Sequence, residues 1–270
     1  MPHAHIYYNV TDTKRKNMLR NKTLALLLTC LLGTLPIAGK RTLIHSHNDY
    51  AQARPFWGAY EAHAASIEAD IWLVEGVLYV SHDKKDIRPE RTLEAMYLQP
   101  IRQVMEQHGG AAYDDGTSFQ LLVDLKTGRE TLDALVRLIE EKNYKHYFDP
   151  TANPAAIQLT ITGDKVKPED FDAYPPYVFF DGRIETTYTP EQLRRIPLIS
   201  EYRGLYTKWK GIGKMSKEDQ QKIRRDVKKA HRQGCKFRIW GFPDNKNAWR
   251  MTRRLDIDYI NTDHPGKASK

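Results

Sequence analysis

Histidine and carboxylate side chains recur at four places in the first half of the sequence, each directly after a short apolar run. Runs of this length predict β-strands, and residues two apart on a strand share one face. Each motif should therefore present its alternate residues together. The four motifs are His45-Ser46-His47-Asn48, Glu68-Ala69-Asp70, Ser81-His82-Asp83 and Asp124-Leu125-Lys126.

Three of these carboxylates form a candidate site for a divalent cation. Glu68 and Asp70 share a strand face, and Asp124 comes from a neighbouring strand. All of their ligand atoms are oxygens, which favours Mg²⁺ or Ca²⁺ over zinc. Three carboxylates leave room on the ion for water or for substrate, and phosphate oxygens are natural ligands. We therefore expect a Mg²⁺ or Ca²⁺ site.

The histidines and the lysine complete a set suited to breaking a phosphodiester. A pair such as His45 and His82 can act as nucleophile or base on one side and as general acid on the other. Lys126 would neutralise charge that builds on a phosphoryl group. Each motif alone also has a structural explanation, because solvated strand ends and satisfied core histidines are common. Their recurrence after four apolar runs favours an active site.

The rest of the sequence supplies elements that can position this set. Polar residues gather at strand ends in a parallel α/β barrel, because its active site is built where the strands finish. Glu75-Gly76 predicts a tight turn, so that 67–73 and 77–82 form a hairpin-like pair. Further strands are predicted at 157–162, 177–180, 198–200, 236–240 and 257–262. Helices are predicted at 55–65, 92–107, 128–142, 216–233 and 245–255.

About eight strands interleaved with helices over ~230 residues are close to the usual size of a (β/α)8 TIM barrel. No flexible linker or break in composition divides residues 40–270. We therefore predict an α/β protein with a single TIM-barrel domain over this range.

Residues 1–39 resemble a secretory signal peptide. Basic residues lie between Lys14 and Lys22, an apolar run covers 24–32, and Ile37-Ala38-Gly39 offers small residues for cleavage. Translation from Met18 would make the preceding residues an upstream extension. The apolar run is shorter than the ~20 residues of a membrane-spanning helix. We expect an exported, periplasmic or secreted, protein, with an uncleaved anchor as the alternative.

Charge and cysteine content limit the partners. The 270 residues carry a formal net charge of +8. Without residues 1–39, 37 basic residues face 33 acidic ones, a balance of +4 spread along the chain. Such a mild excess does not indicate a nucleic-acid-binding surface, although it would help an anionic substrate approach. Only Cys235 would remain, which excludes an internal disulfide, so the core must stabilise the domain.

The motif series resembles the PI-PLC-like phosphodiesterase superfamily, which includes glycerophosphodiester phosphodiesterases and venom-type phospholipases D. The resemblance covers essentially the whole chain after residue 39. It rests on His45 with Asn48, Glu68-Ala69-Asp70, Ser81-His82-Asp83, the segment Leu122-Val123-Asp124-Leu125-Lys126-Thr127-Gly128, and Thr262-Asp263-His264-Pro265.

The resemblance implies a TIM barrel and a role for each matching residue. His45 and His82 would be the catalytic pair, with His47 as the alternative first histidine. Lys126, His47, Asn48 and Trp240 would contact substrate, Trp240 as an aromatic near the seventh strand, although core packing explains Trp240 equally well. Glu68, Asp70 and Asp124 would hold the metal. The substrate would be a glycerophosphodiester or a (lyso)phospholipid-like molecule, with transient contact to a membrane surface.

Three departures leave the substrate open. Ser46 follows His45 where glycerophosphodiester phosphodiesterases usually have arginine, and Asp124 stands where they commonly have glutamate. A Pro-Glu-Asn-Thr-like segment is absent from the sequence. The Asp-Leu-Lys-Thr-Gly run is closer to the venom phospholipase D group. The alcohols on the phosphate, and hydrolysis as opposed to cyclic phosphate formation, remain undecided, as does the oligomeric state.

Two other functions are compatible with parts of the pattern. His45-Ser46-His47 is a His-x-His, which also begins the metal sites of amidohydrolases and PHP-type phosphoesterases. Those sites need further histidines on the middle strands, whereas His63, His108, His146 and His231 fall in predicted helices or loops. A catalytically silent exported binding barrel is the second alternative, because a fold does not dictate a function.

Overall fold

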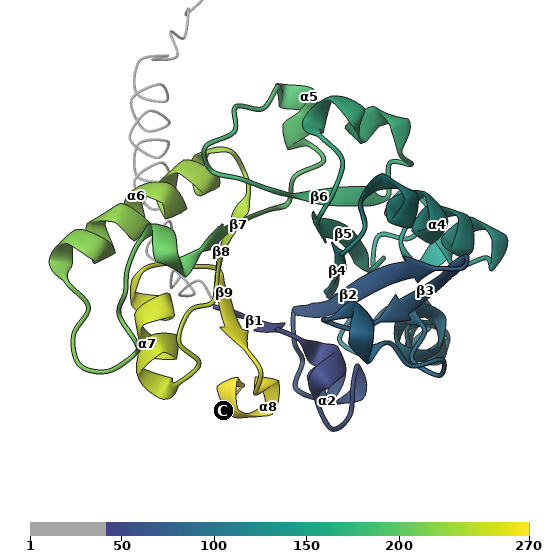
Figure 1. The fold of residues 1–270 in the computed structure, drawn as a ribbon, viewed down its shortest axis with the longest axis horizontal. Helices are drawn as coiled ribbons and strands as arrows, with labels where there is room; N and C mark the ends of the chain where they lie inside the picture. The colour runs from purple at the N-terminus through teal and green to yellow at the C-terminus, as the bar shows by residue number, and fades with distance from the viewer. Residues whose placement is uncertain (1–41, 270) are drawn as a thin grey trace, which may run out of the picture. The chain divides into compact units, whose positions relative to one another are not determined.

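The computed structural model describes residues 42–269, and the predicted signal peptide lies outside this range. Eight parallel strands with helices between them form a nearly closed barrel (Figure 1). The hydrogen-bonded order is β8-β7-β6-β5-β4-β2-β1-β9. These strands are β1 (Leu43–Ser46), β2 (Ser66–Val74), β4 (Gln120–Leu125), β5 (Gln158–Gly163), β6 (Val178–Gly182), β7 (Leu198–Tyr202), β8 (Lys236–Trp240) and β9 (Tyr259–Thr262). The predicted TIM barrel is confirmed.

The seam between β8 and β9 is closed by one residue rather than by a ladder. Asp258 N donates to the Phe237 carbonyl over 3.0 Å, and the Asp258 carboxylate accepts from Phe237 N over 2.8 Å. Thus a side chain supplies a hydrogen bond that a paired strand would otherwise provide.

Helices and helical turns follow most strands. The helices are α2 (Trp57–Glu61), α3 (Gln99–Gln107), α4 (Gly128–Glu141), α5 (Pro190–Leu193), α6 (Lys217–Arg232), α7 (Lys246–Arg254) and α8 (Pro265–Ala268). The shorter turns are η1 (Asp49–Ala51), η2 (Lys84–Asp86), the π-helical η3 (Glu94–Leu98), η4 (Lys145–Tyr147), η5 (Pro168–Ala173) and η6 (Arg203–Leu205). None of the described helices is long and apolar enough to cross a bilayer.

Helix α6 shows how sequence pattern and packing agree. The Ser216 hydroxyl caps it by accepting from Asp219 N over 3.0 Å. Ile223, Val227 and Ala230, three to four residues apart, are buried against the barrel. The remaining positions are mostly charged, so the helix covers the sheet with one narrow apolar stripe.

Strand β3 (Val77–Val80) is the exception to the parallel pattern. It pairs antiparallel with β2 through a turn in which Glu75 (φ 49°) and Gly76 (φ 81°) both have positive φ. That conformation matches the twist of a two-residue hairpin. Strand β2 continues past Asp70 to Val74, and β3 then returns until Ser81 N donates to the Asp70 carbonyl over 3.1 Å. The predicted hairpin-like pair is confirmed, and it returns the chain so that His82 lies beside Asp70.

The main apolar core lies between the strands and the helices, while the interior of the barrel is largely polar. Gln120, for example, is buried and bonds both Ser66 and Thr160. A small separate apolar cluster is formed by Leu122, Leu198 and Tyr259. A polar interior of this kind can hold charged side chains in fixed positions below a site.

Candidate active site

A pocket of about 310 Å³ collects side chains from most strands of the barrel. The carboxyl ends of parallel strands meet at one end of such a barrel, which explains why residues distant in sequence converge there. Its lining is formed by His47, Asn48, Glu68, Asp70, His82, Asp124, Lys126, Thr162, Gly163, Asp181, Arg183, Arg238 and Trp240.

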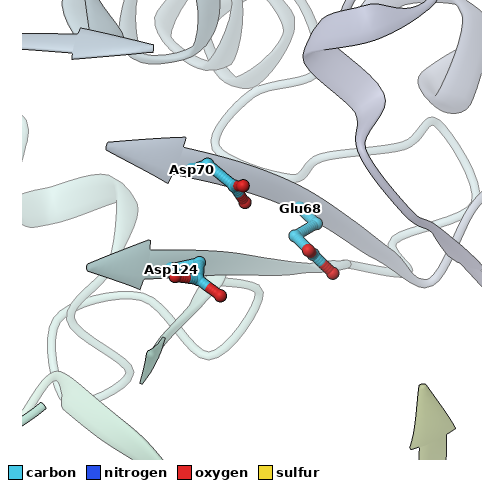
Figure 2. A group of neighbouring side chains, drawn as sticks. All are labelled: Glu68, Asp70 and Asp124. Carbon is cyan, nitrogen blue, oxygen red and sulfur yellow. The ribbon is translucent and has the colours of Figure 1, made fainter. Parts of the chain in front are cut away.

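The three predicted metal-binding carboxylates lie together in this pocket (Figure 2). Asp70 on β2 is directly paired with Asp124 on β4, and Glu68 precedes Asp70 by two residues on the same face. One ligand atom from each of the three lies within 4.8 Å of the others. Asp70 Oδ1 is buried without a hydrogen-bond partner, which is costly unless another group binds it. The donor set therefore fits a hard divalent cation.

The local charges act differently on these acids. Burial, followed by the charge of Asp70, raises the pKa of Asp124 to about 6. Burial also opposes ionisation of Glu68, but Arg238 and His45 outweigh it and hold the Glu68 pKa well below its usual range. Negative charge is thus crowded at Asp124 and compensated at Glu68, and a cation would relieve the crowding.

Lys126 lies between two of these carboxylates. Its Nζ is 2.8 Å from Asp70 Oδ2 and 3.1 Å from Asp124 Oδ1. Burial opposes its charge, but the two acids raise the pKa of Lys126 above its ordinary value. The lysine therefore stays cationic at the pocket wall, where a phosphate would be stabilised by it.

His82 stands at the mouth of the pocket. Its Nδ1 is 3.0 Å from Asp70 Oδ2, while the side chain is 66% exposed. The Tyr50 hydroxyl lies 2.8 Å from the same Asp70 oxygen and 2.7 Å from Asn48 Oδ1. These contacts fix the imidazole by one nitrogen and leave Nε2 for a substrate. The contact with Asp70 thus connects Tyr50 to the site.

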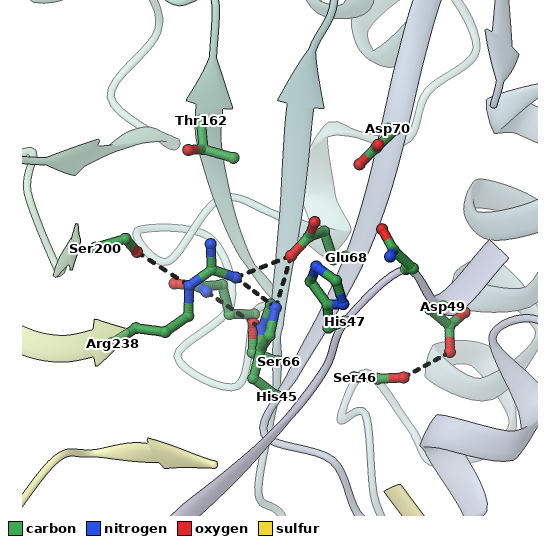
Figure 3. A network of polar contacts seen from close by, with 12 residues as sticks. His45, Ser46, His47, Asp49, Ser66, Glu68, Asp70, Thr162, Ser200 and Arg238 are labelled. Carbon is green, nitrogen blue, oxygen red and sulfur yellow. Dashed lines mark hydrogen bonds and ion pairs between the residues drawn. The ribbon is translucent and has the colours of Figure 1, made fainter. Parts of the chain in front are cut away.

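The two histidines of the first strand occupy different environments (Figure 3). His47 lines the pocket, and its Nδ1 is 2.7 Å from Asp263 Oδ1. Burial opposes protonation of His47, but the hydrogen bond to Asp263 and the negative charges nearby raise its pKa. His47 is thus the first-strand histidine with access to a substrate.

His45 lies beneath the pocket and is fully buried. Its Nδ1 contacts Ser66 Oγ at 2.8 Å, and its Nε2 contacts Glu68 Oε2 at 2.7 Å (Figure 3). Burial, followed by the charge of Arg238, lowers the pKa of His45 to about 4. Since both ring nitrogens have partners and no atom is exposed, the assignment of His45 to the catalytic pair does not fit this geometry. His47, the alternative first histidine, lines the pocket instead.

Arg238 on β8 is the main residue that the sequence analysis missed. Its Nη1 is 2.8 Å from Glu68 Oε2 and also contacts His45 Nε2, while Nε bonds Ser200 Oγ at 3.1 Å (Figure 3). The sequence did contain a signal for Arg238: it lies two residues before Trp240 on the same strand, so both side chains are on the face that lines the pocket. An isolated arginine within an apolar run, however, gives no indication of its partner.

The strands β5, β6 and β8 form the opposite wall of the pocket. The buried Asp181 accepts from the Thr162 hydroxyl over 2.9 Å, while its Oδ1 has no partner. Arg183 donates to the Ser200 carbonyl over 2.6 Å. Trp240 lines the pocket and contacts Tyr202, with ring centroids 4.4 Å apart, so it belongs to the wall rather than to the core.

Comparison with known proteins agrees with this arrangement. Residues 39–168 match the model of the AIM6-like phosphodiesterase domain. "Altered inheritance of mitochondria protein 6" of Eremothecium gossypii is 27% identical over 277 residues, which cover 85% of this chain and 69% of that protein. The homolog of Arthroderma benhamiae is 24% identical over 260 residues, which cover 82% and 80%.

Two solved structures share the fold. A glycerophosphodiester phosphodiesterase from Parabacteroides distasonis has a TM-score of 0.53 at 16% identity, covering 85% of this chain and 95% of its own. A calcium-dependent phosphoinositol-specific phospholipase C from Pseudomonas has a TM-score of 0.52 at 13% identity, covering 86% and 93%. These shared folds and the phosphodiesterase-domain match agree with the predicted resemblance to the PI-PLC-like phosphodiesterase superfamily.

The phosphodiesterase-domain match contains only part of the pocket. His47, His82, Lys126 and the three carboxylates lie within residues 39–168. Asp181, Arg183, Arg238 and Trp240 lie beyond the matched range. The carboxylate and histidine side of the pocket is therefore the part that the family model describes.

Proposed function

We propose that this protein is a metal-dependent phosphoric diester hydrolase that acts on a glycerophosphodiester or a (lyso)phospholipid-like substrate. One observation carries the proposal: a three-carboxylate cluster shares a pocket with His47, His82 and Lys126. Phosphodiester cleavage needs charge stabilisation at the phosphate and proton transfer at both the attacking and leaving oxygens. This pocket contains groups for each task.

Glu68, Asp70 and Asp124 would hold Mg²⁺ or Ca²⁺, since their donors are oxygens and Asp70 Oδ1 lacks a partner. When bound, the ion would supply positive charge to the phosphate oxygens. Lys126, held beside Asp70 and Asp124, would place a second positive charge next to the same phosphate.

His47 and His82 form the proposed catalytic pair. Each has Nδ1 occupied by a carboxylate, Asp263 and Asp70 respectively, so each would present Nε2 to the substrate. One imidazole would act as base or nucleophile, and the other would protonate the leaving alcohol oxygen. The carboxylate contacts would fix the ring orientation and tautomer.

The wall formed by Asp181, Arg183 and Trp240, together with Asn48, would contact the alcohol groups of the substrate. Trp240 offers an aromatic face, and Asp181 Oδ1 is an unused acceptor for a hydroxyl. Binding energy from this wall would orient the phosphodiester for cleavage.

Turnover of a phosphodiester panel tests the proposal. The panel contains glycerophosphodiesters, lysophospholipids and bis(p-nitrophenyl) phosphate, each with Mg²⁺, Ca²⁺ or EDTA. The matched control is Glu191→Gln, a carboxylate change in an exposed ion pair. Metal-dependent cleavage that EDTA abolishes, and that Asp70→Asn lacks, is the expected result. If the protein binds neither ion and cleaves no diester, the catalytically silent barrel is favoured instead.

Export is a further part of the proposal and rests on the sequence of residues 1–39 alone. We expect expression in a host with an export pathway to release a chain that begins near residue 40. Mass spectrometry of the released protein measures the new amino terminus. Retention of the full-length chain inside the cell would contradict it.

A further inference from the structure

Most of the large exposed apolar side chains of the described residues lie at or just after the ends of two strands. The five are Val77, Tyr202, Leu205, Ile212 and Trp240. Tyr202 and Trp240 end β7 and β8, and Leu205 and Ile212 lie in the segment that follows β7. Ile212 is 82% exposed and Leu205 is 63% exposed.

The segment Tyr202–Met215, called the rim loop below, is also strongly basic. It contains Arg203, Lys208, Lys210 and Lys214 and no aspartate or glutamate. The three lysines are exposed. A run of apolar and basic side chains without any acidic residue attracts a surface that is both negative and apolar.

The tip of the rim loop is held in a defined shape. Trp209 Nε1 donates to the Ile212 carbonyl over 2.8 Å. Asn247 Nδ2 lies 2.9 Å from the Gly211 carbonyl and 3.0 Å from that of Gly213. Gly211 has φ +80° and lies so close to Asn245 that a Cβ would clash. Ile212 is therefore presented by a braced turn, and docking would not have to order the tip.

The rim loop lies beside the candidate active site. It begins at the carboxyl end of β7, and the carboxyl ends of the strands carry the pocket. Tyr202 contacts Trp240, whose side chain lines that pocket. Trp209 packs on Phe242, in the connection that follows β8, with ring centroids 5.9 Å apart. A surface docked on the rim loop would face the pocket mouth.

We infer that the rim loop binds an anionic lipid bilayer, with Leu205 and Ile212 inserted into the interface and the lysines at the phosphate headgroups. A protein partner fits the same residues less well, because lysine is depleted in the cores of protein interfaces. Here basic residues flank each exposed apolar residue along the chain, Arg203 and Lys208 on either side of Leu205, and Lys210 and Lys214 on either side of Ile212. That arrangement suits the boundary between headgroups and acyl chains.

Bilayer docking also narrows the substrate class, and this part rests on the proposed function. A phosphodiester in a bilayer lies at headgroup depth, and the docked rim loop would bring the pocket mouth to that level. A lipid phosphodiester would then reach the acid cluster without leaving the membrane. Vesicle binding itself needs no turnover, so the two ideas can fail separately.

Sedimentation of the full chain with vesicles tests the docking surface. Vesicles of phosphatidylcholine alone are compared with vesicles containing 30% phosphatidylserine, at low and high salt. Wild type should bind the anionic vesicles more tightly, and salt should weaken binding by screening. Leu205→Ser with Ile212→Ser should lower the partition coefficient on the order of tenfold to a hundredfold. Lys208→Gln, Lys210→Gln and Lys214→Gln together should lower it on the order of a hundredfold.

Matched controls separate the rim loop from the rest of the surface. Val77→Ser removes another exposed apolar residue. Lys228→Gln, Arg232→Gln and Lys236→Gln remove three exposed charges at the end of α6 and the start of β8, which is the opposite end of the barrel. Both controls should bind like wild type. If the rim-loop variants also bind like wild type, or if wild type ignores anionic vesicles, the inference is overturned.

A kinetic comparison keeps docking and catalysis apart. The rim-loop variants should cleave soluble bis(p-nitrophenyl) phosphate at the wild-type rate and lose at least about tenfold on a lipid substrate in anionic vesicles. Equal loss on both substrates would mean that the rim loop serves the pocket itself. Normal vesicle binding with no turnover of either substrate would leave docking intact and contradict the proposed function.

Discussion

Two polar layers lie one above the other inside this barrel, and they use the same kinds of residue. The lower layer contains His45, Ser66, Glu68, Ser200 and Arg238, joined by direct hydrogen bonds (Figure 3). The upper layer, which the pocket reaches, contains His47, Asp70, His82, Asp124 and Lys126. Glu68 and Arg238 belong to both, because they bond within the lower layer and also line the pocket.

The difference between the layers lies in their unused bonding capacity. Both nitrogens of His45 have partners inside the protein, whereas Asp70 Oδ1 has none and His82 is mostly exposed. A buried network whose members are satisfied makes a structure rigid, while unsatisfied groups next to a pocket are available to a ligand. The lower layer therefore positions Glu68, and the upper layer is suited to bind substrate and metal.

The largest effect should come from Asp70→Asn, which alters the upper layer at its centre. The change removes a charge from the cation site and disturbs the contacts to Lys126 and His82. We expect loss of at least about a thousandfold in turnover, comparable to removing a principal electrostatic group. Calorimetry should show Mg²⁺ or Ca²⁺ affinity lost in parallel. Normal metal binding by this variant would show that the cluster is not the metal site.

His47→Ala and His45→Ala should separate the two layers. His47→Ala should lower turnover by about a hundredfold to ten-thousandfold and leave the unfolding temperature almost unchanged. His45→Ala should instead reduce the free energy of unfolding by about 2–3 kcal/mol, because Ser66 and Glu68 lose a buried partner. Urea unfolding measures the stability of both variants, and a turnover assay measures their activity. The reverse pattern would restore His45 to the catalytic pair.

Arg238→Met tests how the lower layer supports Glu68. Removing the guanidinium leaves the Glu68 carboxylate buried without its main positive partner, which typically costs about 3–5 kcal/mol. If Glu68 is a metal ligand, Mg²⁺ or Ca²⁺ should restore part of this stability. Urea unfolding with metal and with EDTA gives the comparison. Identical destabilisation in both conditions would argue against Glu68 as a ligand.

The smallest effect is expected for Asp263→Asn, measured in metal-free protein. Asp263 raises the pKa of His47, so the variant should titrate His47 at lower pH in an NMR titration. A raised histidine pKa stabilises the fold fully below the unfolded value of 6.5, and this contribution is lost as pH rises through the folded value. Wild type should be more stable than the variant at pH 5.5, by less than about 1 kcal/mol, and equal to it at pH 8.5. An unchanged His47 titration would contradict this assignment.

The barrel and its acid cluster were predictable because they depend on local patterns. Apolar runs at regular spacing predicted most strands, and the alternation in Glu68-Ala69-Asp70 places both carboxylates on one face. Parallel pairing of β2 with β4 then sets Asp124 beside Asp70. The hairpin that carries His82 was predicted from Glu75-Gly76, but the contact that it creates between His82 and Asp70 was not.

The depth of a side chain below the pocket does not follow from such patterns. His45 and His47 have the same type, spacing and strand, so alternation assigns them to one face and cannot rank them by burial. Arg238 contacts Glu68 across the barrel, 170 positions away in the chain. The alternation of side chains is set within a single strand, and it places Glu68 and Asp70 on the same face of β2. Closure of the barrel brings β8 beside β9, so that the Arg238 side chain reaches across the interior to His45 on β1 and Glu68 on β2. That packing buries His45, leaves His47 in the pocket and completes the charge environment of Glu68.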